Sequence, residues 1–283
     1  MKEYYVVFNI ESLAVYPIKS IKGIPLHSSV VNLSGLAHDR RYMVTDTSGN
    51  MITARTQPTL TLVHPVIHDN GSITLTHPKM TSTLELRASS FESSYNETAV
   101  FKQPVKGQKT KSQADEWFSE LLGTPVNLLF FGENSQRFTS RRPESPVAFA
   151  DGYPFLLTNT ASLEELNRTT EIDIDMRRFR SNIVVSGAEA FEEDSWKIIQ
   201  IGEVKFENVK PCARCKFTTI DPDTAEQNKL AEPLRTLAKF RKLDKKGVTF
   251  GVNLIALNEG QIKQGDKVEI IEYQTPEAYL DKR

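Results

Sequence analysis

The chain has 283 residues, of which 39% are hydrophobic and 25% are charged, proportions that indicate a folded protein. Lys and Arg total 35 against 36 for Asp and Glu, so the net charge of -1 excludes the strongly basic field of a general nucleic-acid binder. With only two cysteines, Cys212 and Cys215, a disulfide-built secreted scaffold is also excluded.

The N-terminal residues predict neither a signal peptide nor a membrane anchor. Glu3 and Glu11 interrupt the apolar residues that begin the chain. No stretch reaches the ~20 consecutive apolar residues that a membrane span needs. We therefore expect a protein of the reducing cytoplasm, with no membrane and no nucleic-acid polymer among its partners.

The first hundred residues predict a β-rich region. Short apolar runs are separated by turn signals, of which Asn70-Gly71 is a strong hairpin signal and 48–50 is another. This spacing favours a sandwich or barrel over alternating βα units. The expected strands are Tyr4–Val7, Leu13–Ile18, Tyr42–Thr45, Thr61–Ile67 and Ser72–Thr76.

The pattern changes after Gln108, where an amphipathic helix is predicted at Ser112–Leu122. Ser112 with Asp115 is a possible capping pair, and Gly123 is a possible stop. Further helices are expected from Thr160 and at Glu232–Lys242. The expected strands are Val126–Phe131, Asn182–Val185, Trp196–Ile201, Val204–Val209 and a final pair, Gly251–Leu257 with Lys267–Ile271.

The two cysteines form a Cys-x-x-Cys motif at residues 211–215, Pro-Cys-Ala-Arg-Cys, which several chemistries can use. Zinc normally needs four ligands, and all five histidines lie in the first 77 residues, far from the motif in sequence. A thioredoxin-type pair should open a helix, whereas Asp-Pro-Asp at 221–223 predicts a turn. Two small core residues are a further alternative. Arg214, Lys210 and Lys216 favour the thiolate, which soft transition metals bind.

Arginine gathers in three segments, and most single arginines are expected to be solvated. Arg40 and Arg180 differ because each stands at the start of a predicted strand, where a charge needs a partner. Lys19 and Ser20 follow an apolar strand and offer a cation and a hydroxyl to a phosphate. The segments are Arg137 with Arg141 and Arg142, then Arg177 with Arg178 and Arg180, and Arg40 with Arg41 and Arg55.

Eight segments carry a resemblance that runs in order along nearly the whole chain. They are Tyr-Pro-Ile-Lys-Ser-Ile-Lys-Gly (16–23), Gly-Leu-Ala-His-Asp-Arg-Arg-Tyr (35–42), Thr-Ala-Arg (53–55), Ala-Ser-Leu-Glu-Glu-Leu-Asn (161–167), Phe-Arg-Ser-Asn-Ile-Val-Val-Ser-Gly (179–187), Glu-Asp-Ser-Trp (193–196), Pro-Cys-Ala-Arg-Cys-Lys-Phe-Thr-Thr-Ile-Asp-Pro-Asp-Thr (211–224) and Glu-Pro-Leu-Arg-Thr-Leu (232–237). With these segments the chain resembles the MOSC family, named after the C-terminal domain of molybdenum cofactor sulfurase. Within it, the chain is most similar to the branch of the amidoxime-reducing components and their bacterial relatives.

The resemblance implies a mainly β fold with some α, in which an N-terminal MOSC-type β-barrel domain (1–125) precedes a MOSC β-barrel domain (126–283). It implies a molybdenum–molybdopterin cofactor between the domains. The metal ligand and catalytic residue is then the second cysteine of the motif, Cys215. Asn253 stands where the family has a tyrosine. The implied cofactor contacts are Lys19, Ser20, Arg40, Thr158, Asn159, Arg180, Arg214 and Asn253.

The implied reaction is reduction of the N–O bond of an N-hydroxylated base or an amidoxime, in which two electrons and two protons release the oxygen as water. Asp151 and Asp223 are the carboxylates considered as proton donors. A separate electron donor is expected (a ferredoxin-like protein, a flavin reductase or a cytochrome), because no cysteine follows Cys215 to hold an iron–sulfur cluster. Related MOSC domains carry sulfur as a cysteine persulfide. Sulfur transfer to a molybdenum cofactor or another acceptor is therefore the alternative, as is cofactor storage without turnover.

Overall fold

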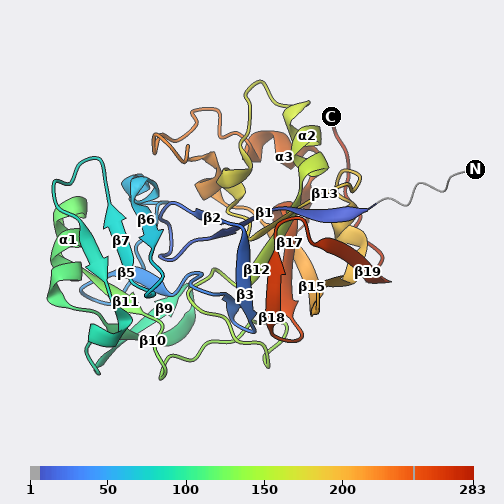
Figure 1. The fold of residues 1–283 in the computed structure, drawn as a ribbon. Coiled ribbons are helices and arrows are strands. Elements are labelled where there is room, and N and C mark those ends of the chain that lie inside the picture. The colour runs from blue at the N-terminus through green and yellow to red at the C-terminus, as the bar shows by residue number, and fades with distance from the viewer. Residues whose placement is uncertain (1–6, 245) are drawn as a thin grey trace, which may run out of the picture.

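The computed structural model describes residues 7–244 and 246–283, which form two lobes (Figure 1). The half-barrel lobe holds β5 to β11 and the helix α1, and the barrel lobe holds the remaining strands and helices. The strands are β1 (Phe8–Val15), β2 (Ile24–Leu26), β3 (Ser28–Asn32), β4 (Gly35–Leu36), β5 (Tyr42–Asp46), β6 (His64–Ile67), β7 (Ile73–Thr76), β8 (Leu84–Leu86), β9 (Tyr95–Val100), β10 (Gln103–Lys109), β11 (Val126–Phe130), β12 (Phe155–Asn159), β13 (Ile183–Ser186), β14 (Trp196–Ile201), β15 (Val204–Ala213), β16 (Lys242–Leu243), β17 (Gly247–Ala256), β18 (Gly260–Lys263) and β19 (Lys267–Tyr273). The helices are α1 (Ser112–Leu122), α2 (Thr160–Asn167) and α3 (Leu234–Phe240), with 3₁₀ turns η1 (Pro58–Leu62), η2 (Ala88–Ser90), η3 (Met176–Phe179), η4 (Glu192–Ser195) and η5 (Lys216–Thr219).

Seven strands close a barrel in the order β12-β13-β1-β19-β14-β15-β17, and the ring closes because β17 also pairs with β12. Its pairs are antiparallel except β12 with β13, which the helix α2 connects, as a parallel pair requires. Strand β1 lies between β13 and β19, with Leu13 opposite Ile183 and Phe8 opposite Val268. The barrel is therefore complete only with a strand from the start of the chain.

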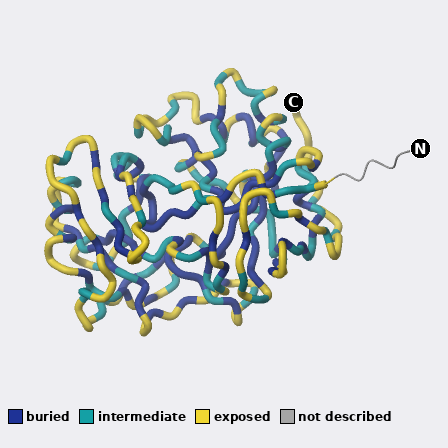
Figure 2. Tube along the Cα trace, in the orientation of Figure 1, coloured by how far each residue is buried: buried dark blue, intermediate teal, exposed yellow. Residues whose placement is uncertain are grey.

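The inner face of the barrel is filled by aromatic and branched side chains. Trp196, Phe155 and Phe206 are fully buried, and the rings of Phe155 and Phe206 meet edge to face at 5.3 Å. Figure 2 shows the buried segments running through the middle of both lobes, with exposed residues at the loops. Burial of this apolar face is the main force that stabilises the barrel.

The half-barrel lobe is an antiparallel sheet of order β5-β11-β10-β9, accompanied by the small sheet β6-β7-β8. Helix α1 buries Trp117 and Phe118 against this lobe and ends at Gly123, whose φ of 67° suits glycine. Strand β11 directly follows the expected domain boundary at 125/126, and it pairs with β5 and β10. The apolar cluster of this lobe reaches Ile220 and Phe217, which come from the η5 region of the second half.

The expected mainly β fold with some α is confirmed, as a closed barrel and a half-barrel. The helix at 112–122 and the strands β5, β11 and β14 match their expected ranges closely. Strand β1 was expected further on, at Leu13–Ile18, because Tyr16, Pro17 and Ile18 extend the apolar run beyond Val15, where the strand ends. The strand expected at Tyr4–Val7 lies, apart from its last residue, outside the described residues.

Two predicted local features are wrong. The final strands β17 and β19 do not pair with each other, because β17 pairs with β12, β15 and β16, and β19 pairs with β1 and β14. The expected cap of α1 is not made, because Lys111 holds the N-cap position and Asp115 instead accepts a hydrogen bond from the backbone N–H of Leu128, at 2.6 Å. Long-range pairing determines both outcomes. Within the described part of the chain, no helix has the length and apolarity needed to cross a membrane.

Candidate functional site

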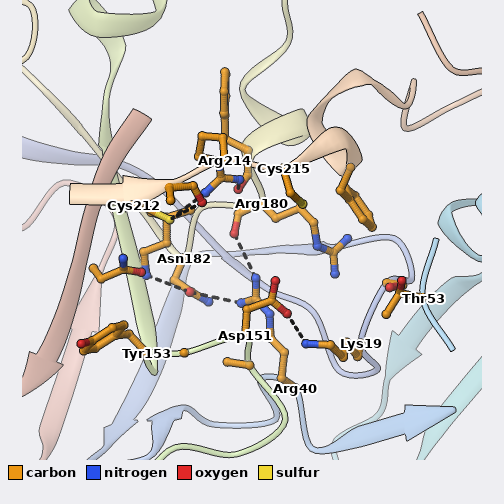
Figure 3. Close-up of a pocket in the computed structure, with 18 of the residues that line it drawn as sticks. Lys19, Arg40, Thr53, Asp151, Tyr153, Arg180, Asn182, Cys212, Arg214 and Cys215 are labelled. Atoms are coloured by element: carbon orange, nitrogen blue, oxygen red, sulfur yellow. Dashed lines mark hydrogen bonds and ion pairs between the residues drawn. The ribbon is translucent and has the colours of Figure 1, made fainter. Parts of the chain in front are cut away.

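A pocket lies where segments of both halves of the chain converge, and Figure 3 shows its polar side chains directed toward a common space. Its walls come from seven regions of the chain. They are the loop after β1, the turn before β5, residues 53–55, the 150–153 loop, the η3–β13 junction, the end of β15 with η5, and the middle of β17. Five of the lining side chains are cationic: Lys19, Arg40, Arg55, Arg180 and Arg214. Asp151 is the acidic residue among those lining it. The pocket therefore favours an anionic ligand.

Most of the residues singled out from the sequence meet in this pocket. They come from segments as distant as residue 19 and residue 253, which the barrel closure brings together. The predicted site residues that line the pocket are Lys19, Ser20, Arg40, Arg180, Arg214, Cys215 and Asn253.

Thr158 and Asn159 were expected at the site, but they do not line the pocket. Both are fully buried at the end of β12. The Thr158 hydroxyl donates to Ser181 Oγ at 2.8 Å. Asn159 caps α2, accepting from the backbone N–H of Ala161 at 3.1 Å. Asn159 thus stabilises the start of α2, and Thr158 stabilises the packing around it. Neither side chain contacts the pocket directly.

Arg40 is held in place by the protein from two sides. Its Nη1 donates to both oxygens of Asp39, at 2.7 and 2.6 Å, and to Asn182 Oδ1 at 3.1 Å. Its Nη2 donates to the carbonyl of Arg180 at 3.0 Å. Asp39 also accepts from the backbone N–H of Tyr16, so one buried carboxylate joins the arginine to the chain segment that follows β1.

Arg180 is half-buried beside the same aromatic ring. The guanidinium carbons of Arg40 and Arg180 lie 4.2 and 4.1 Å from the Tyr16 ring centroid. Arg180 Nη1 donates to the carbonyl of Ile21 at 2.6 Å. Burial, followed by the charge of Arg40, lowers the pKa of Arg180 to about 10, so the side chain is still a cation at neutral pH.

Lys19 and Asp151 form an ion pair across the pocket (Figure 3). Lys19 is 5% exposed, and its Nζ also donates to the carbonyl of Phe149 at 2.9 Å. Burial tends to raise the pKa of Asp151, but Lys19 and then Arg55 hold it at about 2. The Asp151 side chain is 60% exposed, so its carboxylate faces the solvent in the pocket mouth.

The two cysteines have different surroundings within the pocket. Arg214 Nη1 donates to Cys212 Sγ at 3.0 Å, and its Nη2 donates to the carbonyl of Phe179 at 2.6 Å. Cys215 directly precedes η5, and no hydrogen bond of its sulfur is found among the described residues. Both thiols are half-buried and not joined as a disulfide. Arg214 is therefore tied to Cys212, and the Cys215 sulfur is left to face the pocket.

Three residues of the pocket have a backbone conformation that side chains other than glycine rarely adopt. The φ angles of Ser20, Arg40 and Arg180 are 77°, 47° and 59°. Each such residue costs about 1–3 kcal/mol and persists where the surroundings enforce it, commonly at functional sites. Their convergence on one pocket identifies it as the candidate site of the molecule.

Three buried polar atoms of the pocket wall have no hydrogen-bond partner within residues 7–244 and 246–283: Arg180 Nη2, Arg214 Nε and Tyr153 Oη. Buried donors are rarely left unpaired, because each unpaired group costs about 1–3 kcal/mol. A ligand with several hydrogen-bond acceptors and a negative charge would satisfy them. The wall is thus suited to an anionic polar group beside a pair of thiols.

Several pocket residues were not predicted as site residues. Asn182 accepts hydrogen bonds from Arg40 and, at 3.2 Å, from the backbone N–H of Leu156. The sequence feature that could have indicated it is a polar side chain at the start of an apolar strand. Thr53 and Arg55 lay within a matched segment but had no distinguishing context. Asp151 was considered only as a proton donor, and its loop gave no pattern that places it beside Lys19.

Two arginines of another predicted cluster, Arg137 and Arg142, have structural partners. Arg137 is buried, and it donates to the carbonyls of Ala148 and Asp151, at 2.8 and 2.7 Å, which shapes the loop that carries Asp151. Arg142 pairs with Glu207. Among the residues that the structure describes, no group of three or more His, Cys, Asp or Glu side chains is arranged to hold a metal ion.

Comparisons with known proteins match both halves of the chain. Residues 7–125 match the MOSC N-terminal beta barrel domain and residues 144–269 match the MOSC domain. Among curated relatives, human mitochondrial amidoxime reducing component 2 is 32% identical over 280 residues, which cover 93% of this chain and 83% of the relative. Human mitochondrial amidoxime-reducing component 1 is 31% identical, covering 94% and 83%. The zebrafish (Danio rerio) component 1 is 33% identical, covering 93% and 85%.

Among solved structures, the YUAD protein from Bacillus subtilis aligns over 93% of this chain and 94% of its own, with 12% identity and a TM-score of 0.44. The two domain matches and the extended identity to the curated relatives establish the relationship. The chain belongs to the MOSC family, in the group with an N-terminal MOSC β-barrel domain that includes the mitochondrial amidoxime-reducing components.

Proposed function

We propose that this protein is a molybdenum-cofactor-dependent reductase that cleaves the N–O bond of small N-hydroxylated compounds, with the Cys215 thiolate as the protein ligand of the metal. At family level, the MOSC domain and its relatives support a role connected with the molybdenum cofactor. The observation that carries the proposal is one basic pocket in which Cys215 lies with five cationic side chains.

The residues of the pocket suit the chemistry of a molybdenum–pterin cofactor. Its phosphate needs cations and hydroxyl donors, which Lys19, Ser20 and Arg40 offer from the first half of the chain. Arg180 Nη2 and Arg214 Nε are buried donors without a protein partner, suited to the polar edges of a pterin. Soft metals bind thiolate sulfur. Asn253 lines the same pocket and can donate or accept hydrogen bonds there.

The contact between Arg214 and Cys212 supports Cys215 as the ligand. Arg214 Nη1 donates to the Cys212 sulfur and so holds that side chain as part of the wall. Cys215 stands at the start of η5, whose Phe217 packs against the half-barrel lobe. In this assignment Cys212 positions Arg214, and Cys215 binds the metal.

When bound, the cofactor supplies the two-electron redox centre. The residues of this chain bind and orient it and set the charge around the substrate. Asp151 and Asp223 both have a pKa held at about 2, Asp151 by Lys19 against the effect of burial and Asp223 by hydrogen bonds from Arg177 and Lys22. Neither carboxyl carries a proton near neutral pH, so neither suits the role of general acid that was considered for them.

The proposed reaction needs two electrons from another protein, because the pocket residues include no second redox group. We infer a separate electron donor: a ferredoxin-like protein, a flavin reductase or a cytochrome. Its substrate is a small N-hydroxylated molecule. A cytoplasmic location is a prediction from the sequence.

The test is reduction of benzamidoxime by protein isolated from cells that make the cofactor. With chemically reduced methyl viologen as the electron source, the wild type should form benzamidine and the Cys215→Ser variant should not. With NADH or NADPH, turnover should appear only after an electron-carrier protein is added. Benzamidine formation by the Cys215→Ser variant at the wild-type rate would refute the proposal. Turnover with NADH alone would refute the separate donor.

Sulfur transfer is the second candidate, and the observation that favours it is the pair of thiols in one electropositive pocket. A sulfur carrier would be isolated with a persulfide on Cys215 and without molybdenum. Mass spectrometry of a Glu-C peptide that spans Cys212 and Cys215, read together with metal content, separates the two functions.

A further inference from the structure

A second cavity, of about 190 Å³, lies beside the main pocket and shares Arg180 and Phe217 with it. Leu13 and Ala14 of β1, Ile21 and Ile220 give this cavity a mostly apolar wall, to which Tyr16 adds an aromatic ring. Because two residues belong to both cavities, an occupant here would touch the wall of the main pocket.

Arg178 brings an incompletely paired charge to this apolar wall. The residue is 8% exposed, and its Nη2 donates to Asp221 Oδ2 at 2.7 Å. Its Nε and Nη1 are buried and have no partner among the described residues. A buried guanidinium with two unused donor nitrogens is unfavourable unless an acceptor completes it. The arrangement therefore requires a hydrogen-bond acceptor next to an apolar surface.

The two cations at the rim of the cavity are paired with carboxylates. Asp223 accepts from Lys22 Nζ at 2.9 Å and from Arg177, at 3.1 and 2.7 Å, and Arg177 also pairs with Asp175. Arg180 lines the same cavity, and its Nη1 donates to a backbone carbonyl and not to a carboxylate. The charge of Arg180 therefore favours an anion in the cavity.

We propose that the second cavity binds a small aromatic carboxylate. An apolar cavity of about 150 Å³ can hold a benzene ring, so the volume present here admits a ring with one carboxylate. The rings of Tyr16 and Phe217 match a flat apolar body, and the free donors of Arg178 match the carboxylate oxygens. Inorganic phosphate lacks the apolar body that this wall would cover. The proposal does not depend on the function proposed for the main pocket.

Calorimetric titration of the cofactor-free protein with benzoate tests the proposal, with benzamide as the neutral isostere. Benzoate should bind saturably at one site per chain. Benzamide should bind at least about tenfold more weakly, because it lacks the charge that strengthens a hydrogen bond to guanidinium. Equal affinity for the two compounds, or no saturable binding of benzoate, would overturn the proposal.

Two variants and a matched control locate the site. Arg178→Gln should weaken benzoate at least about tenfold. Ala14→Leu fills the cavity without changing any charge, and should abolish benzoate binding. This variant tests the site independently if Arg178→Gln fails to fold. Arg87→Gln also removes an arginine paired with a carboxylate, Glu85, but far from this cavity, and it should bind like the wild type. Unchanged affinity in Ala14→Leu would contradict the assignment.

A last arm separates the second cavity from the main pocket. Protein loaded with its cofactor should bind benzoate as the cofactor-free protein does. Exclusion of benzoate by the cofactor would show that the cavity is part of the main site, and would overturn the proposal. Failure of the protein to load any cofactor would count against the proposed function and not against this one, since benzoate is titrated into cofactor-free protein.

Discussion

At the scale of single residues, Tyr16 is the point around which the basic pocket is organised. Arg40 and Arg180 both place their guanidinium groups about 4 Å from its ring, and Asp39 binds both Arg40 and the Tyr16 backbone. Two cations that contact one ring repel each other, since the charge of Arg40 helps to lower the pKa of Arg180, and stacking on the ring compensates only part of that repulsion. The positive φ angles of both arginines reflect the same constraint. An anionic ligand removes the remaining repulsion.

Glu193 provides a residue-scale prediction about pH. It is fully buried, and Ser162 Oγ donates to it at 3.0 Å. Burial, followed by the charge of Asp194, raises its pKa to about 7. Between pH 4.5 and 7 the folded protein keeps a proton that the unfolded chain loses, so this group makes stability fall as pH rises through that window. Glu193→Gln should remove on the order of 2 kcal/mol of that fall.

The measurement is urea unfolding of wild type and Glu193→Gln at pH 5, 6, 7 and 8. The difference in unfolding free energy between the two proteins should shift in favour of the variant as the pH rises. A difference that is the same at every pH would show that Glu193 does not titrate in this range.

Site residues could be predicted where they lie in a recognisable sequence segment. They were predicted less well where only a long-range contact places them at the site. Lys19, Arg40, Arg180 and Cys215 were predicted because each lies in a recognisable segment, and all four line the pocket. Thr158 was predicted from its neighbours in sequence, but its hydroxyl donates to Ser181 Oγ and it does not line the pocket. Arg178 lines the second cavity, but the sequence placed it only among several clustered arginines.

At the scale of elements, the seam between β12 and β17 closes the barrel, and Gly251 permits it. Its φ is +71°, and a Cβ there would lie 2.5 Å from the carbonyl oxygen of Leu157. Leu157 pairs with Val252 across this seam. Only a residue without a side chain allows β17 to approach β12 so closely.

Gly251→Ala should therefore destabilise the protein by on the order of 3 kcal/mol, from backbone strain together with steric overlap. Gly71→Ala is the matched control, because Gly71 has a φ of +77° but no atom within 4 Å of its would-be Cβ. That control should lose about 1 kcal/mol, from strain alone. Urea unfolding measures both. Equal losses would mean that the close approach at the seam contributes nothing.

Elements with strong local patterns were predicted, and those defined by pairing were not. The helix α1 and the strands β5, β11 and β14 have clear periodicity and flanking turns. The hairpin of β9 and β10 was missed because polar residues such as Gln103 and Lys106 dilute its alternation. The position of β1 inside the barrel could not be read from local sequence, since its two neighbours in the barrel, β13 and β19, lie about 170 residues or more away.

At the scale of the whole molecule, β1 connects the two halves. It completes the barrel formed mainly by the second half, while β11 completes a sheet of the first. With a boundary between residues 125 and 126, the first half thus supplies β1 to the barrel and the second half supplies β11 to the half-barrel lobe. The pocket forms between segments that this exchange of strands holds in place.

A fragment of residues 126–283 should consequently fail to unfold cooperatively, because the barrel lacks a strand between β13 and β19 and exposes two edges. Joining residues 7–17 to that fragment through a flexible linker should restore a cooperative thermal transition. Near-UV circular dichroism during heating measures both. A cooperative transition in the fragment without β1 would contradict the role given to that strand.

The charge of the pocket predicts a specific effect of small anions on the whole protein. Phosphate bound among its cations stabilises the folded state by RT ln(1 + [L]/Kd), about 1.4 kcal/mol at ten times Kd. The melting temperature should then rise by about 2–4 °C over sodium chloride of equal ionic strength. The double variant Arg180→Gln/Arg214→Gln should lose this rise, and Arg87→Gln should keep it. An equal rise in the double variant would mean that phosphate acts only as a general solute.

The central claim is that Cys215, and not Cys212, holds molybdenum in this pocket. Molybdenum and pterin analysis of wild type, Cys212→Ser and Cys215→Ser, purified from cells that make the cofactor, tests it most directly. Wild type and Cys212→Ser should each carry about one molybdenum per chain with a metal–thiolate signal, and Cys215→Ser should lose that signal. Equal metal content and an unchanged thiolate signal in Cys215→Ser, or loss of both in Cys212→Ser alone, would contradict the account.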